Sequence, residues 1–226
     1  MPLNKVPGID YVFRDGSLLL QALTHRSHSS PHYERLEFLG DSLLNLVAAD
    51  LLYRHHSGAP EGDLSRLRSR LVRGATLAEI AKDLELGRHL RLGVGEKRSG
   101  GFLRESILAD LVEAIIGAIY LDGGFDEAYR IVESLLVDRL NNLPSAEALK
   151  DPKTRLQEFR QARGEPLPDY MVISESGADH AKVFRVACRI AGDWQDTEAV
   201  ASNRRRAEQE AAQKMLDQLM ARRSDD

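Results

Sequence analysis

The sequence predicts a helical domain followed by a small α+β domain. Up to about residue 140, apolar residues recur at three- and four-residue spacing between glycine-containing breaks, which is typical of successive amphipathic helices. A polar segment with two prolines at 141–152 interrupts this pattern. Beyond it, a helical segment, three strand-like runs and a final helix follow one another. We therefore expect one domain at 1–145, a linker at 146–152 and a second domain at 153–222.

The individual elements follow from local periodicity. The clearest helices of the first domain are predicted at 34–55, 63–83 and 106–121. In the second domain we expect helices at 153–163 and 203–221, and strands at 169–177, 182–191 and 194–202. The middle strand alternates, because Phe184, Val186, Cys188 and Ile190 alternate with more polar or smaller residues. The order α-β-β-β-α predicts an antiparallel sheet backed by two helices.

Bulk properties exclude several classes of protein. The chain has 226 residues, is 42% hydrophobic and 29% charged, and carries a net charge of −4. Its single cysteine, Cys188, allows no intramolecular disulfide, so we expect a cytoplasmic protein. The N-terminus lacks the apolar core of a signal peptide, and the longest apolar stretch is interrupted by Asp50, so no membrane span is expected. Any nucleic-acid binding must depend on local positive faces.

Two helical segments carry carboxylates among apolar residues. Glu34, Glu37 and Asp41 lie at i, i+3 and i+7, which places them on one stripe of a helix. Asp110 and Glu113 lie at i, i+3 within an otherwise apolar run. Acidic residues at helical spacing are usually solvated surface groups, but the apolar neighbours leave little room here for a polar face.

Such carboxylates need compensation. Several buried carboxylates close together repel, so the cluster needs protonation, basic partners or a divalent cation. Ligand sets made only of oxygen favour Mg²⁺ or Mn²⁺. Gly40 and Gly117 lie in the same two segments and would let the helices approach closely.

The segment ERLEFLGDSLL at 34–44 resembles the signature of the ribonuclease III family. The resemblance continues through 60–74, 97–122 and 151–159, so it covers nearly the whole chain. It implies an all-α endonuclease domain that forms a homodimer, with both active sites in one valley between subunits. It also implies a metal-binding quartet of Glu37, Asp41, Asp110 and Glu113, with Glu34 and Glu61 as nearby acidic residues.

The implied activity is hydrolysis of double-stranded RNA. Mg²⁺ held by carboxylates, with Mn²⁺ as a substitute, can lower the pKa of a bound water and stabilise the leaving oxygen. We expect in-line attack without a side-chain nucleophile, giving 5′-phosphate and 3′-hydroxyl ends with short 3′ overhangs, during processing of ribosomal RNA precursors and other structured transcripts. Asp41 and Glu113 are the favoured catalytic residues, because both lie deepest in their apolar runs.

The sequence allows two interpretations for several basic residues of the first domain. The arginines of 66–73 and the basic residues around Ser99 could reach phosphates or form salt bridges: Arg66, Arg70, Arg73, Lys97, Arg98 and Arg104. His25 is expected to be structural. The chain has no cysteine and histidine spacing typical of zinc sites.

The second domain resembles the double-stranded RNA-binding domain, which contacts two minor grooves and the phosphates between them. The resemblance implies that Thr154, Gln157 and Glu158 meet one minor groove and that His180 meets the next. The last helix would hold phosphates through Arg204, Arg205 and Arg206 at its positive end. The chain departs from the family at Ala199 and Ala201, where glycines are common. These alanines would weaken RNA binding only if the backbone needs φ > 0.

Alternative functions remain at this stage. A non-catalytic RNA-binding regulator predicts a lost carboxylate, and none of the quartet is lost. A di-iron bundle needs Glu-x-x-His pairs, and a histidine-aspartate phosphohydrolase needs an adjacent His-Asp, but the sequence has neither. The partners expected are therefore double-stranded RNA and a second copy of the chain, with no membrane and no other protein implied.

Overall fold

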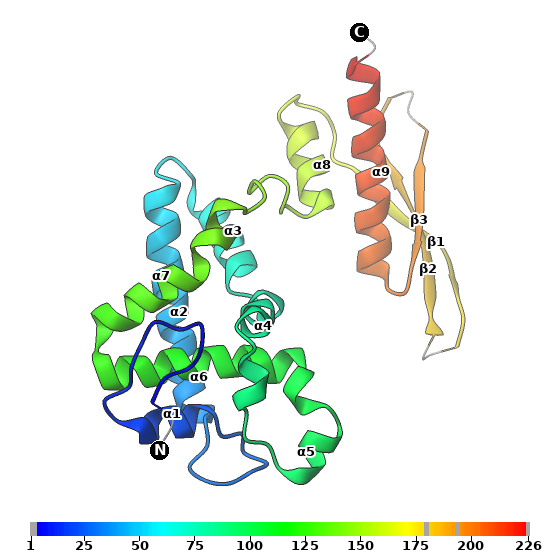
Figure 1. Ribbon diagram of the computed structural model, residues 1–226. Helices are drawn as coiled ribbons and strands as arrows, with labels where there is room; N and C mark the ends of the chain where they lie inside the picture. Colours follow the sequence, from blue (N-terminus) through cyan, green and yellow to red (C-terminus); the bar gives the residue numbers. More distant parts are fainter. Residues whose placement is uncertain (1–3, 179–180, 193–194, 225–226) are drawn as a thin grey trace. The chain divides into compact units, whose positions relative to one another are not determined.

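The computed structural model describes residues 4–178, 181–192 and 195–224. The chain divides into two compact units between residues 146 and 147, and each unit has its own core. Figure 1 shows the first unit as a group of helices and the second as a sheet with helices on one face. The fold class predicted from the sequence is confirmed.

The described part of the first unit is mainly helical, and the loops between its helices contain two isolated β-bridges. Its described residues form two short 3₁₀ segments, Leu86–His89 and Gly101–Leu103, and seven α-helices: α1 Gly16–Ala22, α2 Glu34–His55, α3 Glu61–Leu71, α4 Gly74–Asp83, α5 Val94–Arg98, α6 Glu105–Gly123 and α7 Phe125–Asn141. Helix α6 contacts α1, α2, α4 and α7. This explains its nearly unbroken apolar sequence, because a helix surrounded by others buries most of its faces.

Two glycines let α2 and α6 cross with their backbones in contact, as Figure 1 shows for the two helices. A Cβ atom on Gly40 would lie 1.8 Å from the carbonyl oxygen of Glu113, and one on Gly117 would lie 2.2 Å from that of Leu36. Any side chain at either position would push the helices apart. The close crossing expected from the sequence is confirmed, and it brings the acidic stripes of the two helices together.

One predicted helix is wrong. The sequence pattern suggested a single helix at 63–83, but α3 ends at Leu71 and α4 begins at Gly74. Arg73 is extended, and the buried Thr76 hydroxyl donates a hydrogen bond to the carbonyl oxygen of Arg70 at 3.1 Å. This bond satisfies a carbonyl that the end of α3 would otherwise leave without a partner. Apolar periodicity continues across the break because both helices pack on the same core.

The second unit consists of α8 Pro152–Gln161, β1 Asp169–Ser176, β2 Val183–Arg189, β3 Thr197–Ala201 and α9 Arg204–Ser224. The strands form an antiparallel sheet in the order β1-β2-β3, with a bulge in β1 between Val172 and Ser174. Both helices pack on one face of the sheet around a core that includes Leu156, Cys188, Ile190 and Leu216. Cys188 is free and buried.

In the described part of the chain, no helix is both long enough and apolar enough to cross a membrane.

Candidate functional site

Three carboxylates from α2 and α6 come together where the two helices cross. Glu37 on α2 and Asp110 and Glu113 on α6 each offer an oxygen, and these oxygens all lie within 4.8 Å of one another. All three side chains are half-buried. We call this group the carboxylate triad. The arrangement follows from the glycine crossing, because Gly40 lies against the backbone of Glu113.

Among the described residues, no member of the carboxylate triad forms an ion pair, although the nearby Arg26 and His25 act to lower the pKa of Glu37 and Asp110 respectively. Burial, followed by the charges of Asp41, Asp110 and Glu37, raises the pKa of Glu113 to about 8. Burial and neighbouring carboxylates also raise the pKa of Glu37. Negative charge is therefore concentrated and only partly compensated, which is the situation that a divalent cation would relieve. A donor set made only of carboxylate oxygens fits Mg²⁺ or Mn²⁺.

Tyr33 supports the triad from the start of α2. It is 2% exposed, and its hydroxyl lies 3.5 Å from Oδ2 of Asp110, to which it donates. Burial raises the pKa of Asp110, while this hydrogen bond and the nearby His25 act in the opposite direction. No sequence pattern indicated this role for Tyr33, although Tyr33 directly precedes the acidic stripe of α2.

His25 is structural, as expected. It is buried, its ring packs edge-on against Tyr33, and its Nδ1 lies 2.7 Å from the Ser27 hydroxyl.

Asp41 lies outside the tight group of three. The expectation that it lies deep in an apolar run is wrong, because its side chain is exposed beside exposed Phe38 and Ser42 on α2. Asn45 donates a hydrogen bond to its Oδ1 at 2.8 Å. Its charge is nevertheless the largest contribution from another residue to the raised pKa of Glu113. Asp41 therefore faces the triad from its open side, and its role as a metal ligand stays a prediction.

The two accessory acids have different surroundings. Glu34 pairs with Arg26 at 3.2 Å and approaches His32 at 3.8 Å. Glu61 begins α3, where its carboxylate accepts a hydrogen bond from Ser65 at 2.8 Å. The structure does not bring Glu61 into the carboxylate triad.

A pocket of about 600 Å³ adjoins the triad and includes Glu37 and Asp110 in its wall. Two arginines also line it, and each is paired with an acid: Arg26 with Glu34, and Arg104 with Glu96 at 2.6 Å. The salt-bridged reading that the sequence left open for Arg104 therefore holds. Arg66 is likewise paired, with Asp63.

The predicted minor-groove residues of the second unit share one face. Thr154, Gln157 and Glu158 are exposed on α8, while Leu156 and Arg160 point into the unit. The carboxylate of Glu158 forms an ion pair with Nζ of Lys150 at 2.6 Å. The prediction for His180 falls outside the described residues.

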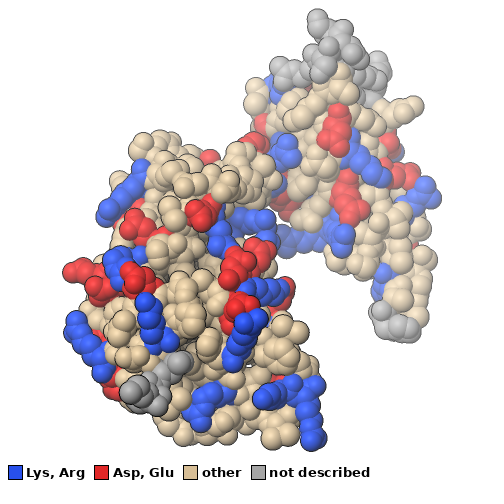
Figure 2. Space-filling model, viewed as in Figure 1, with Lys and Arg blue, Asp and Glu red and all other residues tan. Residues whose placement is uncertain are grey.

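The three arginines at the start of α9 are exposed and paired. Their side chains are 62%, 82% and 67% exposed for Arg204, Arg205 and Arg206. Arg204 binds Glu208 at 2.8 Å and Arg206 binds Glu210 at 3.0 Å, while Arg205 lies 3.9 Å from Asp151. Figure 2 shows acidic and basic side chains interspersed on the visible face of each unit. The arginines reach solvent with their charges partly neutralised.

The departure at Ala199 and Ala201 causes no backbone strain. Both residues belong to β3 and pair with Val186 and Phe184 of β2 in a regular antiparallel register. Ala199 is 3% exposed and contributes to the core. An extended strand accepts alanine as readily as glycine, so no positive φ is required here.

Comparisons with known proteins agree with this arrangement. Residues 15–140 match a family model described as Ribonuclease-III-like, and residues 152–219 match the double-stranded RNA binding motif. The chain is 56% identical to ribonuclease 3 of Alkalilimnicola ehrlichii over 93% of its own length and 92% of that protein. It is 51% identical to ribonuclease 3 of Nitrosococcus oceani, over 96% and 94% of the two lengths.

Solved structures give the same result for the helical unit. The nuclease domain of ribonuclease III from Campylobacter jejuni superimposes with a TM-score of 0.56 and 45% identity, covering 57% of this chain and 90% of that one. That structure is described as showing flexibility in a region involved in dimer formation. A second structure of the same domain gives a TM-score of 0.56 and 43% identity, covering 59% and 92% of the two chains.

Proposed function

The chain belongs to the ribonuclease III family and is an endoribonuclease for double-stranded RNA, and from this premise we propose how it cuts and binds its substrate. It hydrolyses phosphodiester bonds with carboxylate-bound Mg²⁺ and leaves 5′-phosphate and 3′-hydroxyl ends with short 3′ overhangs. Its substrates are ribosomal RNA precursors and other structured transcripts. The observation that carries the proposal is the carboxylate triad, whose three half-buried carboxylates lie close together and form no ion pair with another described residue.

The metal would be held by Glu37, Asp110 and Glu113, with Asp41 completing the site from its exposed side. Bound Mg²⁺, or Mn²⁺ in its place, would lower the pKa of a water and stabilise charge on the leaving oxygen. Asp41 and Glu113 are the residues that we assign to catalysis. Glu34 and Glu61 are accessory acids, of which Glu34 shares a pocket wall with Glu37 and Asp110.

The protein's own residues prepare this site in two ways. Burial and nearby carboxylates raise the pKa of the Tyr33 hydroxyl, so Tyr33 keeps its proton and can donate a hydrogen bond to Asp110. Glu113, with a pKa of about 8, is mostly protonated at neutral pH until a cation displaces the proton. Metal binding is therefore expected to release a proton and to strengthen as the pH rises.

Binding of the duplex is assigned to the second unit. The exposed face of α8 would enter a minor groove through Thr154, Gln157 and Glu158. The start of α9 would hold phosphates through Arg204, Arg205 and Arg206, where the helix dipole adds to their charge. These contacts carry no sequence information, which suits an enzyme for many transcripts. We also retain His180 as a contact to the second minor groove.

The helical unit is proposed to dimerise through α2. Phe38, Leu46 and Tyr53 are 77%, 55% and 71% exposed, and their spacing places them on one side of this helix. Leu121 and Phe125 are also exposed, at the junction of α6 and α7. An apolar surface of this kind marks an interface, and a second copy of the chain would bring two carboxylate triads to the two strands of a duplex.

These assignments give each domain a separate role. We assign catalysis and dimerisation to residues 1–145, a linker to 146–152 and RNA binding to 153–222. We place the protein in the cytoplasm because its single cysteine is buried and unpaired. A non-catalytic regulator is not favoured, because every carboxylate of the quartet is present.

The direct test incubates the protein with long double-stranded RNA, matched single-stranded RNA and double-stranded DNA, each with and without Mg²⁺. We expect cleavage of the double-stranded RNA alone, and only with Mg²⁺, and we expect ends that accept ligation as 5′-phosphates. Cleavage without a divalent ion, or equal cleavage of single-stranded RNA, would overturn the proposal.

The dimer is tested by mixing wild-type and Glu113→Gln subunits and isolating heterodimers on a short duplex. If each site serves one strand, the heterodimers nick the duplex without severing it. Complete cleavage in a single binding event, or an active monomer, would contradict the two-site arrangement.

A further inference from the structure

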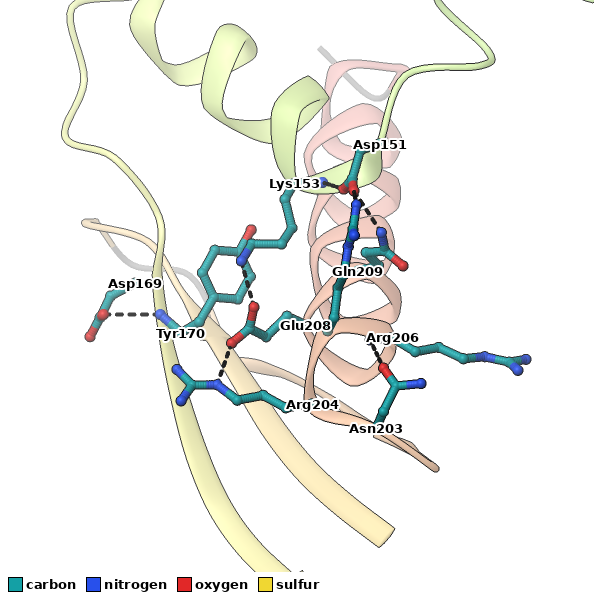
Figure 3. Close-up of polar contacts among 10 residues, drawn as sticks. Asp151, Lys153, Asp169, Tyr170, Asn203, Arg204, Arg206, Glu208 and Gln209 are labelled. Carbon is teal, nitrogen blue, oxygen red and sulfur yellow. Dashed lines mark hydrogen bonds and ion pairs between the residues drawn. The ribbon is translucent and has the colours of Figure 1, made fainter. Parts of the chain in front are cut away.

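Among the described residues of the second unit, Glu208 is an acid that is buried, and it lies close to the exposed arginines of α9. The side chain of Glu208 is 10% exposed, although it lies one turn from the start of α9. Its carboxylate binds two cations that come from different helices (Figure 3). Oε2 accepts from Nζ of Lys153 on α8 at 2.5 Å, and Oε1 accepts from Nε of Arg204 on α9 at 2.8 Å.

The two cations are held in different ways. Nζ of Lys153 also lies 4.4 Å from the centre of the Tyr170 ring, so this ammonium group is fixed between a carboxylate and an aromatic face. Arg204 uses its Nε for Glu208, and Figure 3 shows the rest of its guanidinium directed away from the carboxylate. The side chain of Arg204 is 62% exposed, so its outer amino groups can reach a phosphate.

This contact fixes the spacing between the two helices that we assign to RNA binding. Lys153 directly precedes Thr154 on α8, and Arg204 is the first residue of α9. Asp151 makes a second link, because it caps α8 through the backbone N–H of Lys153 and accepts a hydrogen bond from Gln209 on α9 at 2.6 Å. The start of each helix is therefore tied to the other by a charged, hydrogen-bonded contact.

Glu210 on the same helix provides an internal contrast. It also pairs with an arginine four residues earlier, since Arg206 donates to it at 3.0 Å. Its side chain, however, is 43% exposed, and among the described residues its ion pair is with α9 alone. Glu208 and Glu210 thus have the same charge and the same local pairing, and they differ in burial and in the link to α8.

We propose that Glu208 is a positioning residue for duplex RNA: by binding Lys153 and Arg204 together, it holds the phosphate-binding start of α9 at a fixed distance from the minor-groove face of α8. This inference rests on the RNA-binding roles proposed above. It gives a negatively charged residue a favourable effect on binding to a polyanion, which is opposite to its direct electrostatic effect.

The replacement Glu208→Gln separates these two effects. A carboxylate offers an acceptor oxygen to each cation, whereas an amide offers one oxygen and one donor NH₂ group. The NH₂ group would face a second donor, so either Lys153 or Arg204 must turn away. Electrostatics alone predicts tighter binding, because the variant loses a negative charge near phosphates. Positioning predicts weaker binding.

The experiment measures the affinity of the full chain for a short RNA duplex with a chelator present, so that no cleavage occurs. The variants are Glu208→Gln, the matched control Glu210→Gln, and Arg204→Ala. We expect Glu208→Gln to weaken binding at least about fivefold. The slope of log affinity against log salt concentration should become shallower, by the amount that loss of about one phosphate contact causes. Glu210→Gln should leave affinity unchanged or slightly higher.

Thermal unfolding monitored by circular dichroism establishes that each variant is folded at the binding temperature. A double variant, Glu208→Gln with Arg204→Ala, should bind the duplex with about the same affinity as whichever single variant has the lower affinity. Both changes remove the same phosphate contact, so their effects should not add. A merely structural role would lower the unfolding temperature and leave affinity and salt slope as in wild type.

The outcomes distinguish the inference from the function on which it rests. If Arg204→Ala does not weaken binding, the RNA-binding role of the start of α9 is wrong. If Arg204→Ala weakens binding but Glu208→Gln behaves like Glu210→Gln, that role stands and the positioning role of Glu208 is overturned.

Discussion

Acidic side chains removed from solvent occur in both units, half-buried in the first and buried in the second, but their surroundings are opposite. The carboxylate triad of the helical unit has other carboxylates as neighbours, and the pKa of Glu113 is raised to about 8. In the second unit, burial also opposes the charge of Glu208, but hydrogen bonds from Lys153 and Arg204 outweigh it and hold its pKa below the ordinary value. A buried acid that already has cations organises the fold, whereas a group of acids without them is prepared for an external cation.

The comparison predicts that changes in the two units separate catalysis from binding. The largest effect is expected for Glu113→Gln, which removes one ligand charge and keeps the side-chain volume. Cleavage should fall by more than the roughly 100-fold that loss of a supporting residue costs a metal site. RNA binding should be unchanged, because the second unit is untouched. Single-turnover cleavage and duplex affinity measure the two properties.

The control for this change is Glu133→Gln, an exposed acid on α7 with the same chemistry. It should leave both cleavage and binding as in wild type. Near wild-type turnover of Glu113→Gln at moderate Mg²⁺ would show that the triad is not the active site.

The double variant Arg204→Ala with Arg205→Ala should do the opposite of Glu113→Gln, because it should impair RNA binding and spare catalysis. Loss of two phosphate contacts should weaken binding to all duplex sequences, by about tenfold at moderate salt, and should flatten the salt dependence by about two contacts. Cleavage at saturating RNA should persist. The matched control is Arg189→Ala on β2, whose exposed side chain pairs with Asp196 and lies on the strand face opposite buried Cys188.

Equal loss of affinity in the Arg189→Ala control would show that net charge, and not the start of α9, determines binding. An unchanged salt slope in the double variant would show that these arginines are only a solvated beginning of the helix.

A smaller effect concerns the pH dependence of unfolding without metal. Because the folded pKa of Glu113 lies above its ordinary value of 4.5, the folded state keeps a proton that the unfolded state has lost. Stability from this group is present below about pH 4.5 and is lost as the pH rises to about 8. Glu208 has the opposite sign, since its pKa is lowered, so its contribution is lost on acidification.

Urea unfolding with a chelator, followed by circular dichroism between pH 4 and pH 9, measures both effects. The transition of the helical unit should weaken from acid to neutral pH in wild type and weaken less in Glu113→Gln. If the free energy of unfolding changed with pH in the same way in both proteins, the pKa of Glu113 would not be raised by folding.

Periodicity and small residues predicted much of this molecule. The apolar run of α6 indicated a buried helix, and Gly40 and Gly117 indicated the close crossing that brings the carboxylate triad together. The break near Arg73 was not predicted, because α3 and α4 keep their apolar faces toward one core. Helical spacing also could not show that Asp41 is exposed, since burial depends on neighbouring helices.

Contacts between distant residues were beyond the sequence pattern. Tyr33 and Asp110 are separated by 77 positions, and Lys153 and Glu208 by 55. Each pair joins two helices whose relative placement depends on the whole core of its unit. The arginines at the start of α9 were visible as a basic run, but their pairing with acids became apparent only in the folded chain.

The central claim, that the carboxylate triad is a divalent-cation site, is tested most directly by calorimetric titration of the full chain with Mn²⁺ at pH 7 in buffers of different ionisation enthalpy. We predict that wild type and Glu133→Gln bind Mn²⁺ with equal affinity and release protons as they do so, because Glu113 is mostly protonated before binding. Glu113→Gln should bind Mn²⁺ at least about tenfold more weakly and release fewer protons. Binding of Mn²⁺ to Glu113→Gln with wild-type affinity and proton release would contradict the account.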